Sequence, residues 1–225
     1  MKLTLPIHLE INKSLYLRNP EDSELGRNIL KNSILLMDEM GFEAFNFKKL
    51  ALEIGSTEAG IYRYFENKHK LLLYLTAWYW SWLRLQIIFE TNNLKSADAK
   101  IRKVIKLLAS NVKDDNTTHY INEGVLHRIV VAEGSKAYLT KQVDEDNRQH
   151  FFEPYEQVCE VISVFIRECN PRYKYAMSLA SAVLETAHFQ NYFMDHIPAI
   201  TNFKRKSDQK ELIAFLNHMV FSVLK

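Results

Sequence analysis

The stretch FKKLALEIGSTEAGIYRYF, residues 47–65, contains two short amphipathic segments separated by a glycine. Four residues of the first segment recur at intervals of three and four, which places them on one face of a helix: Phe47, Leu50, Ala51 and Ile54. Gly55 then supplies the positive φ that a sharp turn requires. The stretch therefore predicts two short helices that meet at a tight turn.

Three residues of this stretch have the spacing of a helix-turn-helix unit. Such a unit needs a small residue where the helices cross, a glycine in the turn and a buried aliphatic residue that fixes the crossing. Ala51, Gly55 and Ile61 meet these needs. We expect Thr57 to cap a second helix that runs to Phe65, with Ile61 and Phe65 pointing inward. The outward side chains, which would face a groove, are Glu58, Ala59, Tyr62 and Arg63.

The flanking sequence predicts longer helices. Apolar residues at helical spacing run from residue 24 to residue 40, and Gly41 would end that helix with a left-handed cap. Asn46 suits the N-cap of the short helix that follows, and Asn67 opens a long helix to about residue 89. Short helices of this kind do not fit an up-and-down bundle, which needs longer and matched helices.

Lys68 lies in the first turn of the long helix, where a cation opposes the helix dipole. A bound phosphate would remove the conflict, with the Tyr62 hydroxyl nearby. Lys48 is read either as a DNA contact or as part of a solvated face. For Glu58, stabilisation of a helix start is preferred to a contact with cytosine.

At these residues the chain resembles the tetracycline repressor (TetR) family of bacterial transcription regulators. The resemblance covers residues 25–75 and rests on the block Gly41-Phe42, Phe47-x-x-Leu50-Ala51, Gly55, Ile61-Tyr62-x-Tyr64-Phe65 and Lys68-x-x-Leu71-Leu72. It implies a DNA-binding domain followed by helices for dimerisation and ligand sensing, with Tyr62 and Lys68 gripping phosphates. The DNA-facing residues that it implies are Lys48, Thr57, Glu58, Ala59, Tyr62, Arg63, Tyr64 and Lys68.

Three positions depart from the usual pattern of that family. Ser56 stands where an aliphatic residue is common, and Glu58 where a neutral or basic residue is common. Gly60 stands where a threonine often contacts DNA, and it cannot offer a side-chain hydrogen bond. The departures affect the set of base contacts more than the family resemblance.

The composition is that of a folded, all-helical protein. The 225 residues are 47% hydrophobic and include six glycines and five prolines. The formal charge is +2, and residues 1–75 hold ten Lys/Arg against ten Asp/Glu, so a nucleic-acid partner must be argued from placement. We find no export signal or membrane span and expect a cytoplasmic protein. The exception to the helical pattern is residues 3–11, which alternate as in a strand.

We divide the chain into an N-terminal arm (1–23), a helix-turn-helix DNA-binding domain (24–70) and a helical effector-binding and dimerisation domain (71–225). In the last region, apolar residues at helical spacing predict several helices, one of them starting at Pro171. Segments 171–195 and 208–224 have apolar faces that would join two chains into a homodimer. The DNA partner would then be a palindromic operator.

Aromatic and polar residues of the C-terminal region could line a pocket for an unknown small-molecule effector, although they could equally be core. The candidates are Phe152, Tyr155, His188 and Tyr192. Nothing in the sequence demands a cofactor.

The alternative function is a metal-dependent oxidoreductase. Glu66-x-x-His69 and Glu185-x-x-His188 both match the spacing of ligands in di-iron helical bundles. Two further glutamates would be needed from other helices, and no nucleophile elbow or phosphate-binding loop occurs. We therefore predict a repressor released from its operator by an effector, and not an enzyme.

Overall fold

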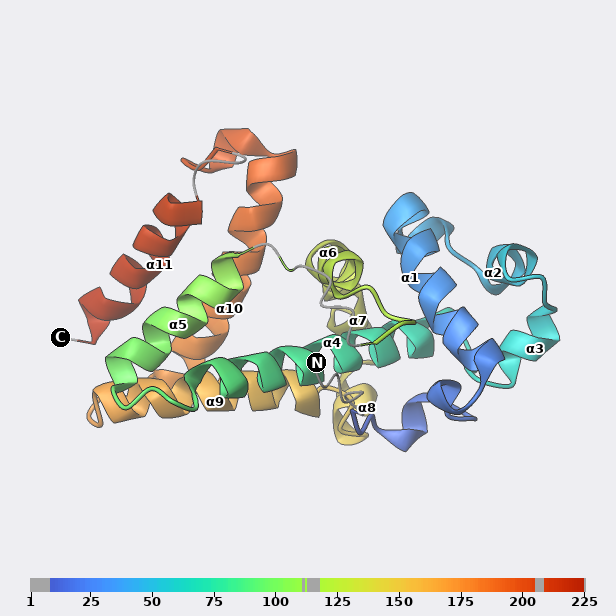
Figure 1. The fold of residues 1–225 in the computed structure, drawn as a ribbon, viewed down its shortest axis with the longest axis horizontal. Coiled ribbons are helices and arrows are strands. Elements are labelled where there is room, and N and C mark those ends of the chain that lie inside the picture. The colour runs from blue at the N-terminus through green and yellow to red at the C-terminus, as the bar shows by residue number, and fades with distance from the viewer. Residues whose placement is uncertain (1–8, 111, 113–117, 205–208, 225) are drawn as a thin grey trace, which may run out of the picture. The chain divides into compact units, whose positions relative to one another are not determined.

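The computed structural model describes residues 9–110, 112, 118–204 and 209–224 (Figure 1). Within these ranges every regular element is a helix, which confirms the predicted all-α fold. No helix in them is both long and apolar enough to cross a bilayer. Most of the segment with strand periodicity lies outside the described residues, and Leu9 and Ile11 are buried without forming a strand.

Packing divides the chain into two compact units. The first comprises residues 1–81 and 112–153, and the second comprises residues 82–111 and 154–225. Helix α4, Lys68–Thr91, contributes residues to both units. The functional boundaries predicted after residues 23 and 70 stay a proposal, because packing alone does not define function.

The first unit holds the helix-turn-helix region, whose helices are α1 (Glu24–Ala44), α2 (Phe47–Glu53) and α3 (Glu58–Tyr62). Two caps predicted from the sequence are present. The Asn46 side chain accepts a hydrogen bond from the Lys49 amide, and the Thr57 hydroxyl accepts one from the Gly60 amide. Each bond satisfies an amide that the start of a helix leaves without a backbone partner. α4 likewise begins after Asn67, as predicted.

Three further helices complete the first unit: α6 (Glu123–Glu133), α7 (Ser135–Tyr138) and α8 (Val143–Arg148). α6 packs against α1, where the Arg128 guanidinium donates two hydrogen bonds to the Asp38 carboxylate. On α6, the His127 Nδ1 forms a 2.7 Å hydrogen bond with the hydroxyl of the buried Tyr79 of α4. Burial, aided by the charge of Arg128, lowers the pKa of His127 to about 4, so this imidazole is neutral at pH 7.

The second unit contains α5 (Ala97–Ala109), α9 (Glu153–Cys169), α10 (Ala176–His196) and α11 (Gln209–Val223). α5 packs against both α10 and α11, and α10 packs against α11. Pro171 does not start a helix, contrary to prediction. The Asn170 side chain instead accepts a hydrogen bond from the Arg172 amide, which holds a turn, and α10 begins at Ala176.

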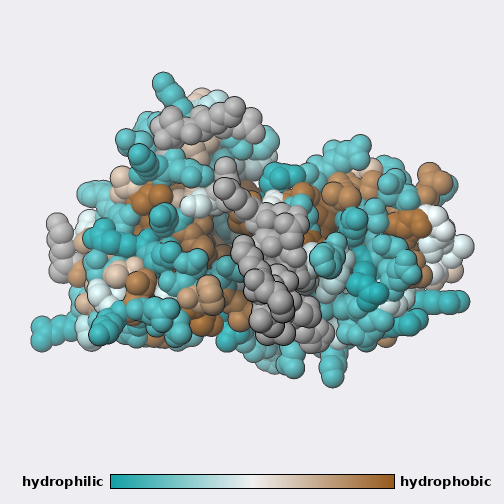
Figure 2. All heavy atoms as spheres, in the orientation of Figure 1, coloured by the Kyte–Doolittle hydropathy of each residue, from teal (hydrophilic) through white to brown (hydrophobic). Residues whose placement is uncertain are grey.

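Apolar side chains on the surface are interspersed with polar ones in the view of Figure 2, in which brown patches interrupt the teal surface over α5 and α11. The exposed apolar residues of α10 and α11 include Met177, Phe189, Phe215 and Val223. Scattered exposure of this kind is normal in monomers, so these residues alone do not show what covers α10 and α11.

Candidate nucleic-acid interface

The predicted helix-turn-helix frame is built as the sequence indicates. Ala51 and Ile61 are buried, and Gly55 has φ +63°, a conformation that residues with a Cβ rarely adopt. The Ser56 amide donates a 2.9 Å hydrogen bond to the Ala51 carbonyl, which closes the turn. Phe47 and Leu50 are also buried, so one face of α2 is used for packing. The opposite face is therefore available for a partner.

Six of the eight predicted DNA-facing residues are exposed: Lys48, Thr57, Glu58, Ala59, Tyr62 and Arg63. The Tyr62 side chain is 48% exposed, and its ring meets the Phe47 ring edge-on at 5.0 Å. This contact packs one side of the ring while about half of the side chain stays exposed. The Thr57 hydroxyl is used as the cap of α3, so any DNA contact by this side chain must share that oxygen.

Two departures from the family pattern, Ser56 and Gly60, lie next to each other in the structure. A Cβ built on Gly60 would lie 2.9 Å from the Ser56 Oγ and 3.4 Å from the Thr57 Oγ1. The space that a threonine side chain would need at position 60 is therefore partly occupied by the Ser56 hydroxyl. The two residues suit each other as a pair.

Tyr64 corrects the predicted DNA-facing set, because this residue is only 2% exposed. α3 ends at Tyr62 rather than Phe65, and Tyr64, which only the family resemblance placed among the DNA-facing residues, follows the buried Ile61 by three residues. Its hydroxyl lies 2.7 Å from the Ser23 Oγ at the start of α1. Tyr64 is thus a packing residue that joins α1 to the end of α3.

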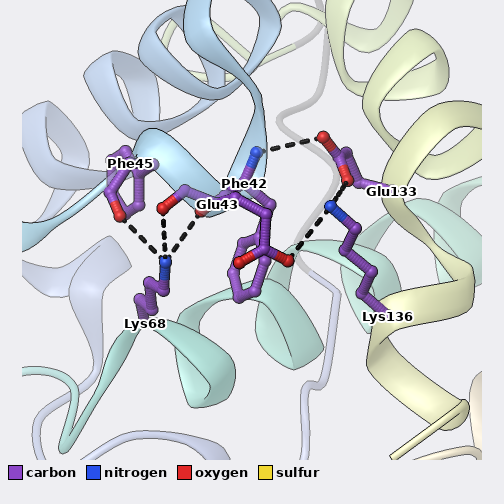
Figure 3. A network of polar contacts seen from close by, with 6 residues as sticks. All are labelled: Phe42, Glu43, Phe45, Lys68, Glu133 and Lys136. Atoms are coloured by element: carbon purple, nitrogen blue, oxygen red, sulfur yellow. Dashed lines mark hydrogen bonds and ion pairs between the residues drawn. The ribbon is translucent and has the colours of Figure 1, made fainter.

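Lys68 also differs from the interpretation based on the helix dipole. Its Nζ lies 2.9 Å from the Phe42 carbonyl oxygen and 3.1 Å from those of Glu43 and Phe45 (Figure 3). An ammonium has three N–H donors, so each one has an acceptor. These carbonyls lie in the last turn of α1 and at its C-cap, beyond the non-helical Gly41, so their oxygens need donors from elsewhere in the chain. The charge at the start of α4 is therefore stabilised by another helix, and the dipole no longer argues for a phosphate there.

The end of α1 depends on two further charged side chains. Gly41 has φ +76° and interrupts the helical backbone, and the Phe42 amide beyond it donates a 3.0 Å hydrogen bond to the Glu133 carboxylate of α6. The Lys49 Nζ lies 2.8 Å from the Ala44 carbonyl oxygen. Two lysines thus donate to carbonyls, and one glutamate accepts from an amide, that have no backbone partner at the end of the helix. Only Gly41 gave a sequence signal for this arrangement.

A tyrosine–carboxylate cluster links the residues before α1 to α4. The Tyr74 hydroxyl donates a 3.1 Å hydrogen bond to the Glu21 carboxylate, and Tyr120 also hydrogen-bonds to it. Burial raises the pKa of Tyr74 strongly, and the nearby Glu21 charge adds to the rise. The hydroxyl therefore stays protonated and remains a donor.

The predicted ligand-binding residues are divided between the two units. Phe152 belongs to the first, while Tyr155, His188 and Tyr192 belong to the second. The Tyr155 hydroxyl of α9 donates a 2.7 Å hydrogen bond to Glu185 of α10, one turn before the buried His188. Burial, with the nearby Glu185 charge, raises the pKa of Cys159 to about 11. The second unit thus contains a polar cluster within an apolar surrounding, and its role in ligand binding stays a prediction.

The two Glu-x-x-His pairs do not assemble a metal centre. His69 lies 3.1 Å from Asp146 of α8, whereas Glu185 binds Tyr155. Among the described ranges, no group of three or more His, Cys, Asp or Glu side chains converges on one point. The oxidoreductase alternative is therefore not supported by the donor geometry.

Comparison with known proteins gives one family match, for the family described as bacterial regulatory proteins, tetR family, over residues 29–75. A search of curated proteins found no match. The matched residues begin within α1, contain all of α2 and α3, and end within α4.

Several solved structures have a similar fold. AibR in complex with isovaleryl coenzyme A and operator DNA is 14% identical with a TM-score of 0.60, over 87% of this chain and 98% of that one. The fatty acid degradation regulator FadR from Bacillus halodurans gives the same identity and TM-score, over 84% and 96%. A putative TetR-family regulator from Syntrophomonas wolfei str. Goettingen is 17% identical with a TM-score of 0.61, over 88% and 93%. Identities this low show likeness of fold only.

Proposed function

We propose that the chain, whose residues 29–75 match the tetR family of bacterial regulatory proteins, is a ligand-responsive transcription regulator that binds DNA through α2 and α3. One observation carries the proposal. Along the matched segment, one face of the helix pair is buried and the other presents Lys48, Tyr62 and Arg63 to solvent. A major groove admits a helix such as α3. The amine, hydroxyl and guanidinium donors beside it can then bind phosphates and base edges.

The proposed DNA contacts divide by chemistry. Lys48 and Tyr62 bind phosphates, Lys48 through its charge and Tyr62 through a neutral hydroxyl. Contacts of this kind position the protein on DNA and carry no sequence information. Arg63 is the proposed base-reading residue, since a guanidinium can donate two hydrogen bonds to a guanine edge. The remaining proposed contacts are Thr57, Glu58 and Ala59.

The regulator acts as a homodimer joined through α10 and α11. This arrangement would cover the exposed apolar residues of these helices, including Met177, Phe189 and Phe215. A two-fold dimer presents two copies of α3, so its operator is a near-palindrome with half-sites spaced by a helical turn or a multiple. The chain acts in the cytoplasm as a repressor rather than as an enzyme.

A small molecule controls the affinity for the operator. The names of two similar structures, one with isovaleryl coenzyme A and one concerned with fatty acid degradation, support a small-molecule effector of this kind. The second unit, with its Tyr155–Glu185 cluster, is the proposed binding region. The effector lowers DNA affinity by the difference in its own affinity for the two states of the protein.

Selection of bound sequences from random DNA tests the proposal. The expected result is a near-palindromic sequence bound by two chains, with the stoichiometry measured by sedimentation of the complex. Recovery of no enriched sequence by the folded protein would contradict the DNA-binding function. An asymmetric single site bound by one chain would leave that function intact and contradict the dimer.

A further inference from the structure

The described part of the arm that precedes α1, residues 9–23, is linked to the end of α3. Its buried anchor is Leu15, within the short 3-10 helix η1, Lys13–Leu15. The Leu17 amide donates a 2.8 Å hydrogen bond to the Tyr64 carbonyl, two residues beyond the end of α3. The Ser23 and Tyr64 hydroxyls form a second link of 2.7 Å. Both links bind the arm to a residue whose chain neighbour, Arg63, is exposed.

Arg18 lies between these two links and is exposed. Its guanidinium carbon is 5.5 Å from the centroid of the Tyr64 ring, a cation–π distance. Because Tyr64 is itself held by Ser23 and by Leu17, the ring gives the guanidinium a rigid support. An arginine supported in this way loses less conformational entropy when it binds a partner.

The carboxylates nearest to Arg18 along the arm have other partners. The Glu21 carboxylate accepts from the Tyr74 hydroxyl, and the Asp22 carboxylate accepts a 3.0 Å bond from the Asn19 amide group. In the part of the chain that the structure describes, no carboxylate lies within ion-pair distance of the Arg18 guanidinium. Lys49 and Lys68, in contrast, are occupied by backbone carbonyls. Toward the described residues, the Arg18 guanidinium thus has no carboxylate partner, and its donors suit an external anion.

We propose that Arg18 binds a phosphate of the DNA duplex next to the groove that α3 enters, so that the arm belongs to the DNA-binding surface. This inference rests on the proposed function. The planar fork of a guanidinium matches two phosphate oxygens, and each neutralised phosphate releases condensed counterions. The contact reads no base, so it strengthens binding to every duplex alike.

The test uses the full chain, the selected operator and a scrambled duplex of equal length, titrated at several salt concentrations. Arg18→Ala is expected to weaken binding to both duplexes by a similar factor of roughly five, and to reduce the slope of log affinity against log salt by about one. Arg18→Lys should retain the slope. The matched control is Lys13→Ala, an exposed cation of the same arm with no described contact with Tyr64, which should leave both quantities unchanged.

The outcomes separate the inference from the proposed function. If the wild-type chain binds neither duplex, the proposed function fails. If the wild-type chain binds but Arg18→Ala has wild-type affinity and slope, the inference is overturned while the function stands. A loss confined to the operator would also overturn it, because it would indicate base reading. If Arg18→Ala melts at a lower temperature, Arg18→Gln takes its place, since the amide can still pack on Tyr64 without the charge.

Discussion

The two ends of α1 are stabilised in different ways. At the first end a neutral hydroxyl, Ser23, accepts from the Gly26 amide at 3.1 Å and meets the Tyr64 hydroxyl. At the other end, charged side chains satisfy the backbone: Lys49 and Lys68 donate to four carbonyls, and Glu133 accepts from one amide. The cap at the first end is neutral, whereas the second end is held by charged side chains, two of them from α4 and α6.

The position of a cation in the sequence does not show whether its donors are free to bind DNA. Lys68 has a position that suggests an anion site, yet its three donors are used inside the protein. Arg18 gives no motif signal, yet its guanidinium rests on an aromatic ring with solvent beyond it. A cation can serve a ligand only with donors that the fold has left free.

Replacing Lys68 should have the largest effect on stability. Lys68→Ala leaves three carbonyls at the end of α1 without their charged donor, which should cost about 2–3 kcal/mol in the free energy of unfolding. For a chain of this length we expect the melting temperature to fall by roughly 5–10 °C, measured at fixed protein concentration. Lys48→Ala is the control, because this exposed lysine should change stability by less than about 0.5 kcal/mol.

A different result for Lys68→Ala would contradict the structural role of the ammonium. If Lys68→Ala melts like the wild type but binds every duplex more weakly, with a salt slope reduced by about one, the ammonium acts on a phosphate. The end of α1 would then not depend on it, and the contrast between the two helix ends would disappear.

Glu133 should have the next largest effect. Its carboxylate accepts from the Phe42 amide at 3.0 Å and pairs with Lys136 at 2.7 Å (Figure 3). Glu133→Ala therefore leaves the Phe42 amide without its acceptor and Lys136 without this ion pair. We expect a loss of about 1–2 kcal/mol, measured from denaturant midpoints. Glu133→Gln should recover about half of it, because the amide oxygen can still accept from Phe42.

Lys136→Met serves as the control for the ionic part of this contact. Lys136 is partly exposed and pairs with both Glu133 and Glu43, so the loss should be below about 1 kcal/mol. A loss as large as that of Glu133→Ala would mean that the ion pair, and not the hydrogen bond to the backbone, holds this end of α1.

Sequence reasoning succeeded where the structure is local. The caps at Asn46 and Thr57 and the positive φ of Gly55 depend on residues within a few positions, and all three are present. The helix-turn-helix frame follows from them, because the inward positions of α2 and α3 repeat at helical spacing. The bounds of α1, α2 and α3 and the start of α4 were therefore predictable to within about a turn of helix.

The same reasoning failed where the partner is remote in sequence. Lys68 donates to carbonyls 23 to 26 residues away, and Glu133 accepts from an amide 91 residues away, so no local pattern indicates either. Tyr64 was placed among the DNA-facing residues by the family resemblance alone, and its buried hydroxyl instead meets Ser23, 41 residues away. For Pro171, a turn held by Asn170 replaced the expected helix start.

Ser23 tests the neutral end of α1. Ser23→Ala removes the cap of the helix and the partner of the Tyr64 hydroxyl, and should cost about 1 kcal/mol in the free energy of unfolding. Ser23→Thr keeps the hydroxyl and should restore most of that loss. A loss comparable with that of Lys68→Ala, measured under the same conditions, would show that the two ends of α1 do not differ in strength.

The smallest effect is expected for Tyr64→Phe, which keeps the buried ring and removes only the hydroxyl. The Ser23 hydroxyl can still accept from the Gly26 amide, so we expect a loss of about 0.5 kcal/mol in stability and no change in DNA affinity. Tyr62→Phe, two residues earlier and exposed, should show the reverse: unchanged stability and DNA binding weaker by about 1 kcal/mol. The pair is informative because both variants remove one phenolic hydroxyl from neighbouring positions. If Tyr64→Phe weakened binding to operator and scrambled duplexes while its melting temperature stayed at the wild-type value, the Tyr64 hydroxyl would be a DNA contact, and the inward position assigned to it would be wrong.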